Sequence, residues 1–309
     1  MSCLHPIKAW RNTFSDFRNK KRAAPFFSPP PAAALAGGTV KPCPLPCGRC
    51  LGCRLDYSRQ WAMRGVCELQ MNDRACFATL TYAPEHLGLL PGGASLSRPD
   101  YQKFFKRLRK RGFKFTYMLA GEYGEKLGRP HFHVIFFGED FRKDSYPAPV
   151  RQSKEMPLYC SKTLTDVWGK GHVVLGDVSF SSIQYVAGYI TKKISGEKAR
   201  DHYQGRLPEF MQASLKSPIG RKWLDKYMSD VFPRDEFIFK GKIMKPPKYF
   251  RKVYSELFPE KALELSIKRE TFIESSKDNF TPEALAAKEE ILLSKFKQRL
   301  RKLETQLSA

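Results

Sequence analysis

The sequence has no run of about 20 apolar residues, which is the length a helix needs to cross a bilayer. Its opening stretch, residues 1–21, carries basic and aromatic residues but lacks the apolar core of a secretory signal. It also has no Gly-x-x-x-x-Gly-Lys-Ser/Thr segment, so strand unwinding driven by ATP is not expected of this chain. These absences favour a protein that acts in a cytoplasm, without a membrane partner and without a motor of its own.

Acidic residues are scarce relative to basic ones. The 309 residues include 54 lysines and arginines against 31 aspartates and glutamates, which gives a formal net charge of 54 − 31 = +23. Such a balance predicts a polyanionic partner, but charge alone does not distinguish DNA from RNA or from an anionic membrane. Because 42% of the residues are hydrophobic, the chain can still build a sizeable core and is not expected to be disordered overall.

Four of the eight cysteines lie in one short run that is rich in proline and glycine: Cys43, Cys47, Cys50 and Cys53. Thiolates this close together suit tetrahedral Zn²⁺ better than disulfides, and a reducing compartment favours the metal. A zinc site usually draws its ligands from two separated segments, so an iron–sulfur cluster and a metal-free run stay open as alternatives. The remaining four are expected to be ordinary buried or surface thiols: Cys3, Cys67, Cys76 and Cys160.

A short apolar strand over 130–137 contains two histidines that share one face. Alternate side chains of a strand point the same way, so His131 and His133 project together. A second apolar strand over 115–121 and a glycine-containing loop predict a hairpin, which brings Glu122 opposite His131. Two imidazoles and one carboxylate suit a divalent ion such as Mg²⁺ or Mn²⁺, although these ligands discriminate poorly between metals. The alternative is a pair of strand histidines that bind nothing.

Further along the chain, Tyr185 and Tyr189 lie in a segment, 181–194, whose apolar residues recur at helical spacing. Side chains four residues apart on a helix have Cβ atoms about 5–6 Å apart, so both hydroxyls could reach one phosphate. Lys192 and Lys193 follow within a turn of Tyr189, where a cation can steady a phosphate oxygen. For this spacing taken alone, two aromatic rings packing the edge of a helix are the alternative.

The predicted metal ligands and the two tyrosines together indicate phosphodiester chemistry. A phenol has a reference pKa of about 10 and is a weak nucleophile at neutral pH. A divalent ion that polarises the non-bridging oxygens of a phosphodiester makes its phosphorus more electrophilic. Attack by a tyrosine oxygen would leave a phosphotyrosyl bond on one strand end and a free hydroxyl on the other, and the retained phosphoester would allow rejoining.

These residues resemble the HUH endonucleases, which are named for two histidines flanking a bulky hydrophobic residue. Within that superfamily the sequence is most similar to the replication initiators of small single-stranded DNA phages of the microvirus (gokushovirus) type. Three segments within 41–195 carry the resemblance in the family's order: a core strand at 77–82, the metal motif of Glu122, His131 and His133, and the nucleophile positions Tyr185 and Tyr189.

The resemblance also implies an order for the two tyrosines. Phage initiators with tandem tyrosines are expected to show Tyr-x-x-Lys twice in succession. Tyr189 with Lys192 meets this pattern, whereas Gly188 stands where Tyr185 would have its lysine. The resemblance therefore implies that Tyr189 is the primary nucleophile, assisted by Lys192, and that Tyr185 is the candidate for a second nucleophile.

The function implied by the resemblance is that of a site-specific endonuclease and ligase for single-stranded DNA. It would initiate rolling-circle replication of a small circular genome through a 5′-phosphotyrosyl intermediate, with Mg²⁺ or Mn²⁺ as the cofactor. The implied partners are single-stranded DNA at a replication origin and the helicase and polymerase of a bacterial host, in whose cytoplasm it would act. A transposase or relaxase-type strand transferase of the same superfamily is one alternative, and a non-catalytic, metal-containing nucleic-acid-binding module is another.

The order of predicted elements over 61–195 is βαββαβα, so the expected class is α+β. This order matches a ferredoxin-like (RRM-like) antiparallel sheet with helices on one face. Before it we expect a flexible extension over 1–40, with a proline run and an alanine run, and the cysteine cluster over 41–60. After it, 196–309 is expected to be a basic and partly helical region.

Overall fold

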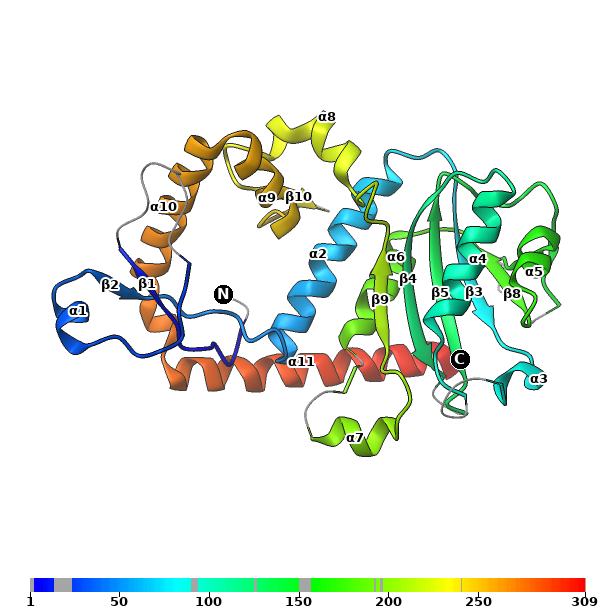
Figure 1. Cartoon of the computed structure of the whole chain (residues 1–309), viewed down its shortest axis with the longest axis horizontal. Coiled ribbons are helices and arrows are strands. Elements are labelled where there is room, and N and C mark those ends of the chain that lie inside the picture. Colours follow the sequence, from blue (N-terminus) through cyan, green and yellow to red (C-terminus); the bar gives the residue numbers. More distant parts are fainter. Residues whose placement is uncertain are drawn as a thin grey trace. The chain divides into compact units, whose positions relative to one another are not determined.

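The computed structural model describes residues 3–13, 24–89, 94–124, 127–149, 157–191, 193–194, 197–239 and 241–308 (Figure 1). The chain divides into two compact units. One consists of Met1–Asp56, Phe232–Phe237 and Met244–Ala309, and the other of Tyr57–Val231 and Ile238–Ile243. We refer to them as the terminal unit and the sheet unit.

The strands of the described residues are β1 (Trp10–Asn12), β2 (Val40–Pro42), β3 (Ala75–Thr81), β4 (Thr116–Tyr123), β5 (Pro130–Phe137), β6 (Ser145–Pro147), β7 (Tyr159–Ser161), β8 (Val173–Gly176), β9 (Phe210–Ala213), β10 (Phe237–Phe239) and β11 (Lys242–Met244). The α-helices are α1 (Ala32–Ala36), α2 (Leu51–Leu69), α3 (Pro84–Leu87), α4 (Arg98–Lys110), α5 (Lys162–Trp168), α6 (Phe180–Gly188), α7 (Lys198–Tyr203), α8 (Arg221–Val231), α9 (Lys248–Leu257), α10 (Pro259–Ser275) and α11 (Pro282–Ser308). Two 3₁₀ turns complete them, η1 (Tyr189–Thr191) and η2 (Lys277–Phe280).

The sheet unit is built on a seven-stranded sheet in the order β6-β7-β8-β3-β5-β4-β9. Every neighbouring pair in it is antiparallel. The chain is therefore of the α+β class, as predicted. The strand with the two histidines, β5, lies between β3 and β4 and is paired with both along its length.

One face of this sheet is covered by α4 and α5. Alternate residues of β5, among them Phe132 and Phe136, point to this face and pack with Phe104 of α4 and Trp168 of α5. Ring pairs of this kind hold helix and strand in a fixed relation, since aromatic contacts are directional as well as apolar. This face is the main aromatic core of the unit.

The other face of the sheet is also covered, by α6 and by the part of α2 that belongs to this unit (Figure 1). Ile135 of β5 and Met118 of β4 pack there with Ile183 of α6. The expectation of helices on one face only is therefore wrong. The physical reason lies in β5 itself, where both sets of alternate side chains are largely apolar and buried, so each face needs a covering layer.

The terminal unit contains a short antiparallel ladder close to the start of the described chain. β1 pairs with β2, and the pairing continues through an isolated bridge between Ile7 and Leu45. Cys3, Leu4 and Ala9 are buried. Over residues 3–13 the structure thus differs from the flexible extension expected for 1–40, because these residues pair with a strand some 30 positions along the chain, a contact that local composition does not reveal.

The rest of the terminal unit is helical. Phe232 stacks on Tyr254 of α9, with ring centroids 4.1 Å apart. Arg269 of α10 forms an ion pair with Asp235 at 2.6 Å, and Glu270 of the same helix contacts Lys41 at 3.1 Å. The basic, partly helical region expected over 196–309 is shared between the two units instead of forming one body. Among the described residues, no helix combines the length and the apolar character that crossing a membrane requires.

Gly171, at the entry to β8, offers a test of the packing at the end of β3. Its φ is +148°, and a Cβ placed on it would lie 2.4 Å from the Thr81 carbonyl oxygen and 2.5 Å from the Ala83 nitrogen. We expect Gly171→Ala to destabilise the protein by about 2–4 kcal/mol, because backbone atoms cannot yield as a side chain does. Gly88→Ala is the matched control, since its φ is −66° and a Cβ there meets nothing within 4 Å. Thermal unfolding of the two variants checks this, and equal midpoints would contradict it.

Candidate active site

The register of the β4–β5 hairpin brings a carboxylate and two imidazoles together. Glu122 is paired with His131 across the hairpin, as predicted. One carboxylate oxygen, Glu122 Oε1, lies 2.6 Å from His131 Nε2 and 3.1 Å from His133 Nε2. The three side chains form a group whose ligand atoms all lie within 4.8 Å of one another, which is an arrangement that could hold a metal ion.

The opposite nitrogen of each imidazole is held by a neighbouring group. His131 Nδ1 lies 3.2 Å from the Arg129 carbonyl oxygen, and His133 Nδ1 lies 3.1 Å from the Thr79 hydroxyl. A carbonyl can only accept a hydrogen bond, so Nδ1 of His131 carries the proton and the Nε2 lone pair of the neutral ring faces Glu122. Lone pairs that converge on a carboxylate oxygen need a cation or a proton between them. The donor set therefore fits a divalent ion, with Thr79 and Arg129 orienting its ligands.

The carboxylate of this group stays charged throughout the working pH range. Burial raises the pKa of the Glu122 carboxyl, but hydrogen bonds with His131 and His133 outweigh burial and lower it to about 2. Glu122 and His133 are both buried, whereas His131 is half-buried. A buried charge that is held by two imidazoles is well suited to a second cation at the same place.

The tyrosine segment differs in detail from the predicted helix over 181–194. Helix α6 begins earlier than predicted, because Ser179 caps it and forms reciprocal side-chain to backbone hydrogen bonds with Ser182. The α-helix ends at Gly188 and continues as the 3₁₀ turn η1, which begins at Tyr189. The two tyrosines therefore lie on successive turns of different winding.

Both tyrosine rings lie against the same imidazole. The Tyr189 ring stacks on His133 with a centroid distance of 5.2 Å and an interplanar angle of 3°. The Tyr185 ring meets His133 edge to face at 5.3 Å, and the two tyrosine rings are 4.7 Å apart. Phe77 of β3 stacks on His133 as well, at 5.5 Å. The structure thus brings the predicted nucleophiles and the predicted metal ligands into one site.

The two tyrosines differ sharply in their access to solvent. Tyr189 is 2% exposed and belongs to the core beneath the sheet, whereas Tyr185 is 48% exposed. A phosphate on a DNA strand can approach an exposed phenol directly. Access therefore favours Tyr185 for a first attack, the reverse of the order that the Tyr-x-x-Lys pattern implies. Lys192, the predicted assisting cation, lies outside the described residues.

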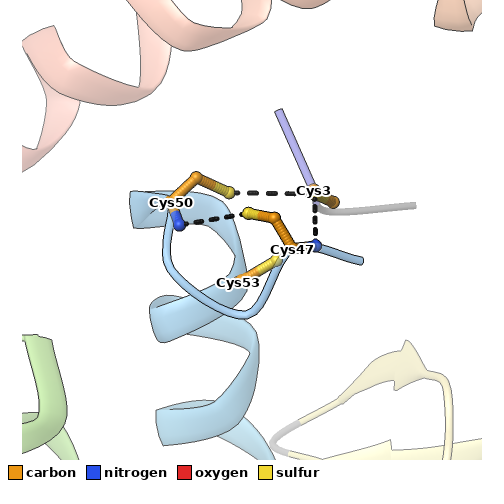
Figure 2. A group of neighbouring side chains, drawn as sticks. All are labelled: Cys3, Cys47, Cys50 and Cys53. Atoms are coloured by element: carbon orange, nitrogen blue, oxygen red, sulfur yellow. Dashed lines mark hydrogen bonds between the residues drawn. The ribbon is translucent and has the colours of Figure 1, made fainter. Parts of the chain in front are cut away.

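A second group that could hold a metal lies in the terminal unit and consists of Cys3, Cys47, Cys50 and Cys53 (Figure 2). Cys43, which the sequence pattern includes, is not part of it, and Cys3 takes the fourth place. The prediction was wrong at this ligand, because the ladder of β1 and β2 decides which cysteine reaches the other three. The rule that zinc ligands come from two separated segments was the one signal that pointed beyond the cysteine run.

Sequence reasoning also missed Thr79. The strand 77–82 was assigned to the core, but Thr79 pairs with His133 in the β3–β5 register and its hydroxyl contacts the ring. The alternation along β3 carries the signal: Phe77 and Thr79 share the face opposite to Ala78 and Leu80, which lie in the aromatic core.

Comparisons with known proteins agree on one group. A family model for replication-associated proteins of the ORF2 type matches residues 75–194, which include every residue of the carboxylate, imidazole and tyrosine site. The chain is 33% identical over 280 residues to the replication-associated protein VP4 of Bdellovibrio phage phiMH2K, covering 87% of this chain and 82% of that protein. It is 34% identical over 218 residues to the replication-associated protein ORF2 of Spiroplasma virus 4, covering 67% and 66% of the two chains. No solved structure matches the chain.

Thr79 provides a test of the metal group that leaves its three ligands in place. We expect Thr79→Val to lower the affinity for Mn²⁺ by about 10–100-fold, because the hydroxyl that orients His133 is lost. Thr81→Val is the control on the same strand, since its hydroxyl donates to the His172 carbonyl at 3.1 Å and not to an imidazole. Electron paramagnetic resonance of free Mn²⁺ measures both affinities. Equal affinities in the two variants would show that Thr79 does not support a bound ion.

Proposed function

The chain belongs to the family of phage replication-associated proteins, the microvirus-type rolling-circle replication initiators, and on that premise we propose that it nicks and rejoins single-stranded DNA at a replication origin. The observation that carries the proposal is the contact of two tyrosine rings with the imidazole of His133, one of three side chains whose ligand atoms converge. A nucleophile and a group able to hold a cation are both needed to attack a phosphodiester, and here they share one side chain.

The covalent step balances within the site. The phenol oxygen of a tyrosine gives up its proton and forms a bond to phosphorus, and the bond from phosphorus to the 3′ oxygen breaks. The 3′ oxygen takes up a proton and leaves as a free hydroxyl, while the 5′ phosphate stays on the tyrosine. Attack by a 3′ hydroxyl on the phosphotyrosine reverses these changes and reseals the strand, so no external energy source is required.

Glu122, His131 and His133 would hold the divalent ion, for which Mg²⁺ and Mn²⁺ suit the donors and the chemistry. When bound, such an ion supplies positive charge that polarises the phosphate and offsets the charge that builds on it. The protein's own contribution is orientation. Thr79 and Arg129 fix the two imidazoles, and the sheet fixes the carboxylate, so the ligands stand in place before DNA arrives.

The two tyrosines have different roles in this proposal. Tyr185, which is half exposed, makes the first attack. Tyr189, buried against His133, attacks in a later step, while the first tyrosine carries the DNA. Two nucleophiles allow a second cut after a round of synthesis, which suits repeated nicking and closure better than a single transfer event. Lys192 is proposed to steady a phosphate oxygen next to Tyr189.

The wider setting follows from the same premise. The protein would act in the cytoplasm of an infected bacterium and would need a host helicase and polymerase, because its sequence has no nucleotide-binding loop for a motor. The excess of 23 positive charges supports binding to the DNA backbone. We also propose that the core is ferredoxin-like, which the central strand order β8-β3-β5-β4 supports.

The metal group is tested by its separation from DNA binding. With labelled single-stranded origin DNA and Mn²⁺, the wild-type protein is expected to form an adduct that survives denaturation. The double substitution of His131 and His133 by Ala should abolish the adduct but leave DNA affinity nearly unchanged, because lysines and arginines supply the binding. An adduct that persists in the double variant would refute the metal site. Salt-sensitive binding without any adduct in the wild type would indicate a non-catalytic binding module.

The order of the nucleophiles is tested with two matched variants that each remove one hydroxyl and keep the ring. We expect Tyr185→Phe to abolish the first adduct, because the accessible nucleophile is lost. Tyr189→Phe should keep the first adduct and lose transfer to a second origin strand. Mapping the tyrosine that carries the nucleotide by mass spectrometry gives an independent reading. A first adduct lost in Tyr189→Phe and kept in Tyr185→Phe would restore the order implied by the Tyr-x-x-Lys pattern.

A further inference from the structure

We propose that Cys3, Cys47, Cys50 and Cys53 bind one zinc ion, and that this ion fastens the segment Cys3–Ala9 to the start of α2. This site is separate from the nicking chemistry and does not depend on it. The ligands come from two parts of the chain, a segment before β1 and the loop that leads into α2, as Figure 2 shows.

The spacing of the sulfur atoms fits one tetrahedral ion. All four lie within 4.8 Å of one another, and those of Cys3 and Cys50 are 4.0 Å apart. A disulfide requires about 2.05 Å, so this pair is not bonded, and all four thiols are free. Thiolates bound to Zn²⁺ at about 2.3 Å occupy tetrahedron corners that are about 3.8 Å apart. The observed separation is therefore close to the one that a single ion sets.

The same spacing argues against an iron–sulfur cluster. In a four-iron cluster each thiolate binds a different iron, so the sulfurs stand at the corners of a larger body than one ion. Four thiols gathered as closely as these leave room for one ion at their centre. The geometry thus separates two interpretations that the spacing of cysteines in the sequence leaves open.

Backbone amides are arranged to stabilise thiolates at this site. The amide of Leu4 donates to the Cys50 sulfur at 3.4 Å, and the amide of Cys47 donates to the Cys3 sulfur at 3.2 Å. The amide of Cys50 donates to the Cys47 sulfur at 3.4 Å. Cys53 lies in the first turn of the 19-residue helix α2, whose amino-terminal end favours negative charge. Metal ligands need their thiolate form, and these contacts supply it.

The β-ladder explains why Cys3 and not Cys43 completes the set. The Cys43 amide donates to the Ala9 carbonyl, and Ile7 exchanges two hydrogen bonds with Leu45. Continuing this antiparallel register carries Cys3 towards the residues that follow Cys47. Cys43 lies four residues before Cys47 on an extended stretch, a span of about 13 Å, which is too far for the compact set of sulfurs.

The consequence for the fold is a cross-link within the terminal unit. Cys3 is separated from Cys47 by 44 positions in the sequence, and the hydrogen bonds of the ladder join the segments between them. An ion bound by both segments converts this short ladder into a closed structure, and its binding free energy adds to the stability of the folded state.

The experiment compares Cys3→Ser with Cys43→Ser in the full-length chain, tagged only at its carboxyl end. Elemental analysis after dialysis should find one zinc ion per chain, without iron, in the wild type and in Cys43→Ser. Cys3→Ser and Cys50→Ser should lose most of it. The variant Glu122→Gln should keep its zinc while losing the nicking adduct, so failure of this proposal and failure of the nicking proposal give different results.

Cobalt substitution shows whether a weakened variant has merely unfolded. Co²⁺ in the wild type and in Cys43→Ser should give the intense visible bands of a tetrahedral site with thiolate charge-transfer absorption. Cys3→Ser should give altered bands with the helical circular dichroism of the wild type. A wild type without zinc, iron with labile sulfide in place of zinc, or loss of zinc in Cys43→Ser but not in Cys3→Ser would each overturn the proposal.

Discussion

The antiparallel register between β4 and β5 is the constraint on which the active site depends. It places Glu122 opposite His131, and the alternation along β5 then puts His133 on the same face. A shift of one residue would turn both histidines into the aromatic core and bring phenylalanines to the site. Because both faces of β5 are packed, such a shift would disrupt two layers at once. The core that holds the hairpin in register therefore also fixes the chemistry.

The same face of the sheet explains how the tyrosines are positioned. Ile183, Val186 and Ala187 anchor α6 on β4 and β5, and this packing presents Tyr185 and Tyr189 to His133. The anchoring is uneven along the segment. Tyr189 is part of the apolar layer, whereas Tyr185 stands at its margin and reaches solvent. One helix thus offers two phenols of different accessibility to one imidazole.

Much of the site could be predicted because its determinants are local. The period of two along β5 indicated the paired histidines, the hairpin composition indicated Glu122, and the spacing of four indicated the tyrosines. The features that were missed depend on contacts between distant segments. Cys3 reaches its partners through a ladder that crosses 44 positions, and Thr79 touches His133 through the pairing of β3 with β5. The unequal burial of the two tyrosines, likewise, is a property of the packed layer and not of the Tyr-x-x-x-Tyr spacing.

The central position of β5 has a consequence for how the site works. This strand is hydrogen-bonded to neighbours on both edges, so its backbone can move only when the sheet opens as a whole. The imidazoles lose little conformational entropy on binding an ion, because folding has already ordered them. Tyr189 lies instead where α6 gives way to a 3₁₀ turn, at a helix end, where fraying is least costly. Rigid electrostatics and an adaptable nucleophile are thus assigned to different secondary structures.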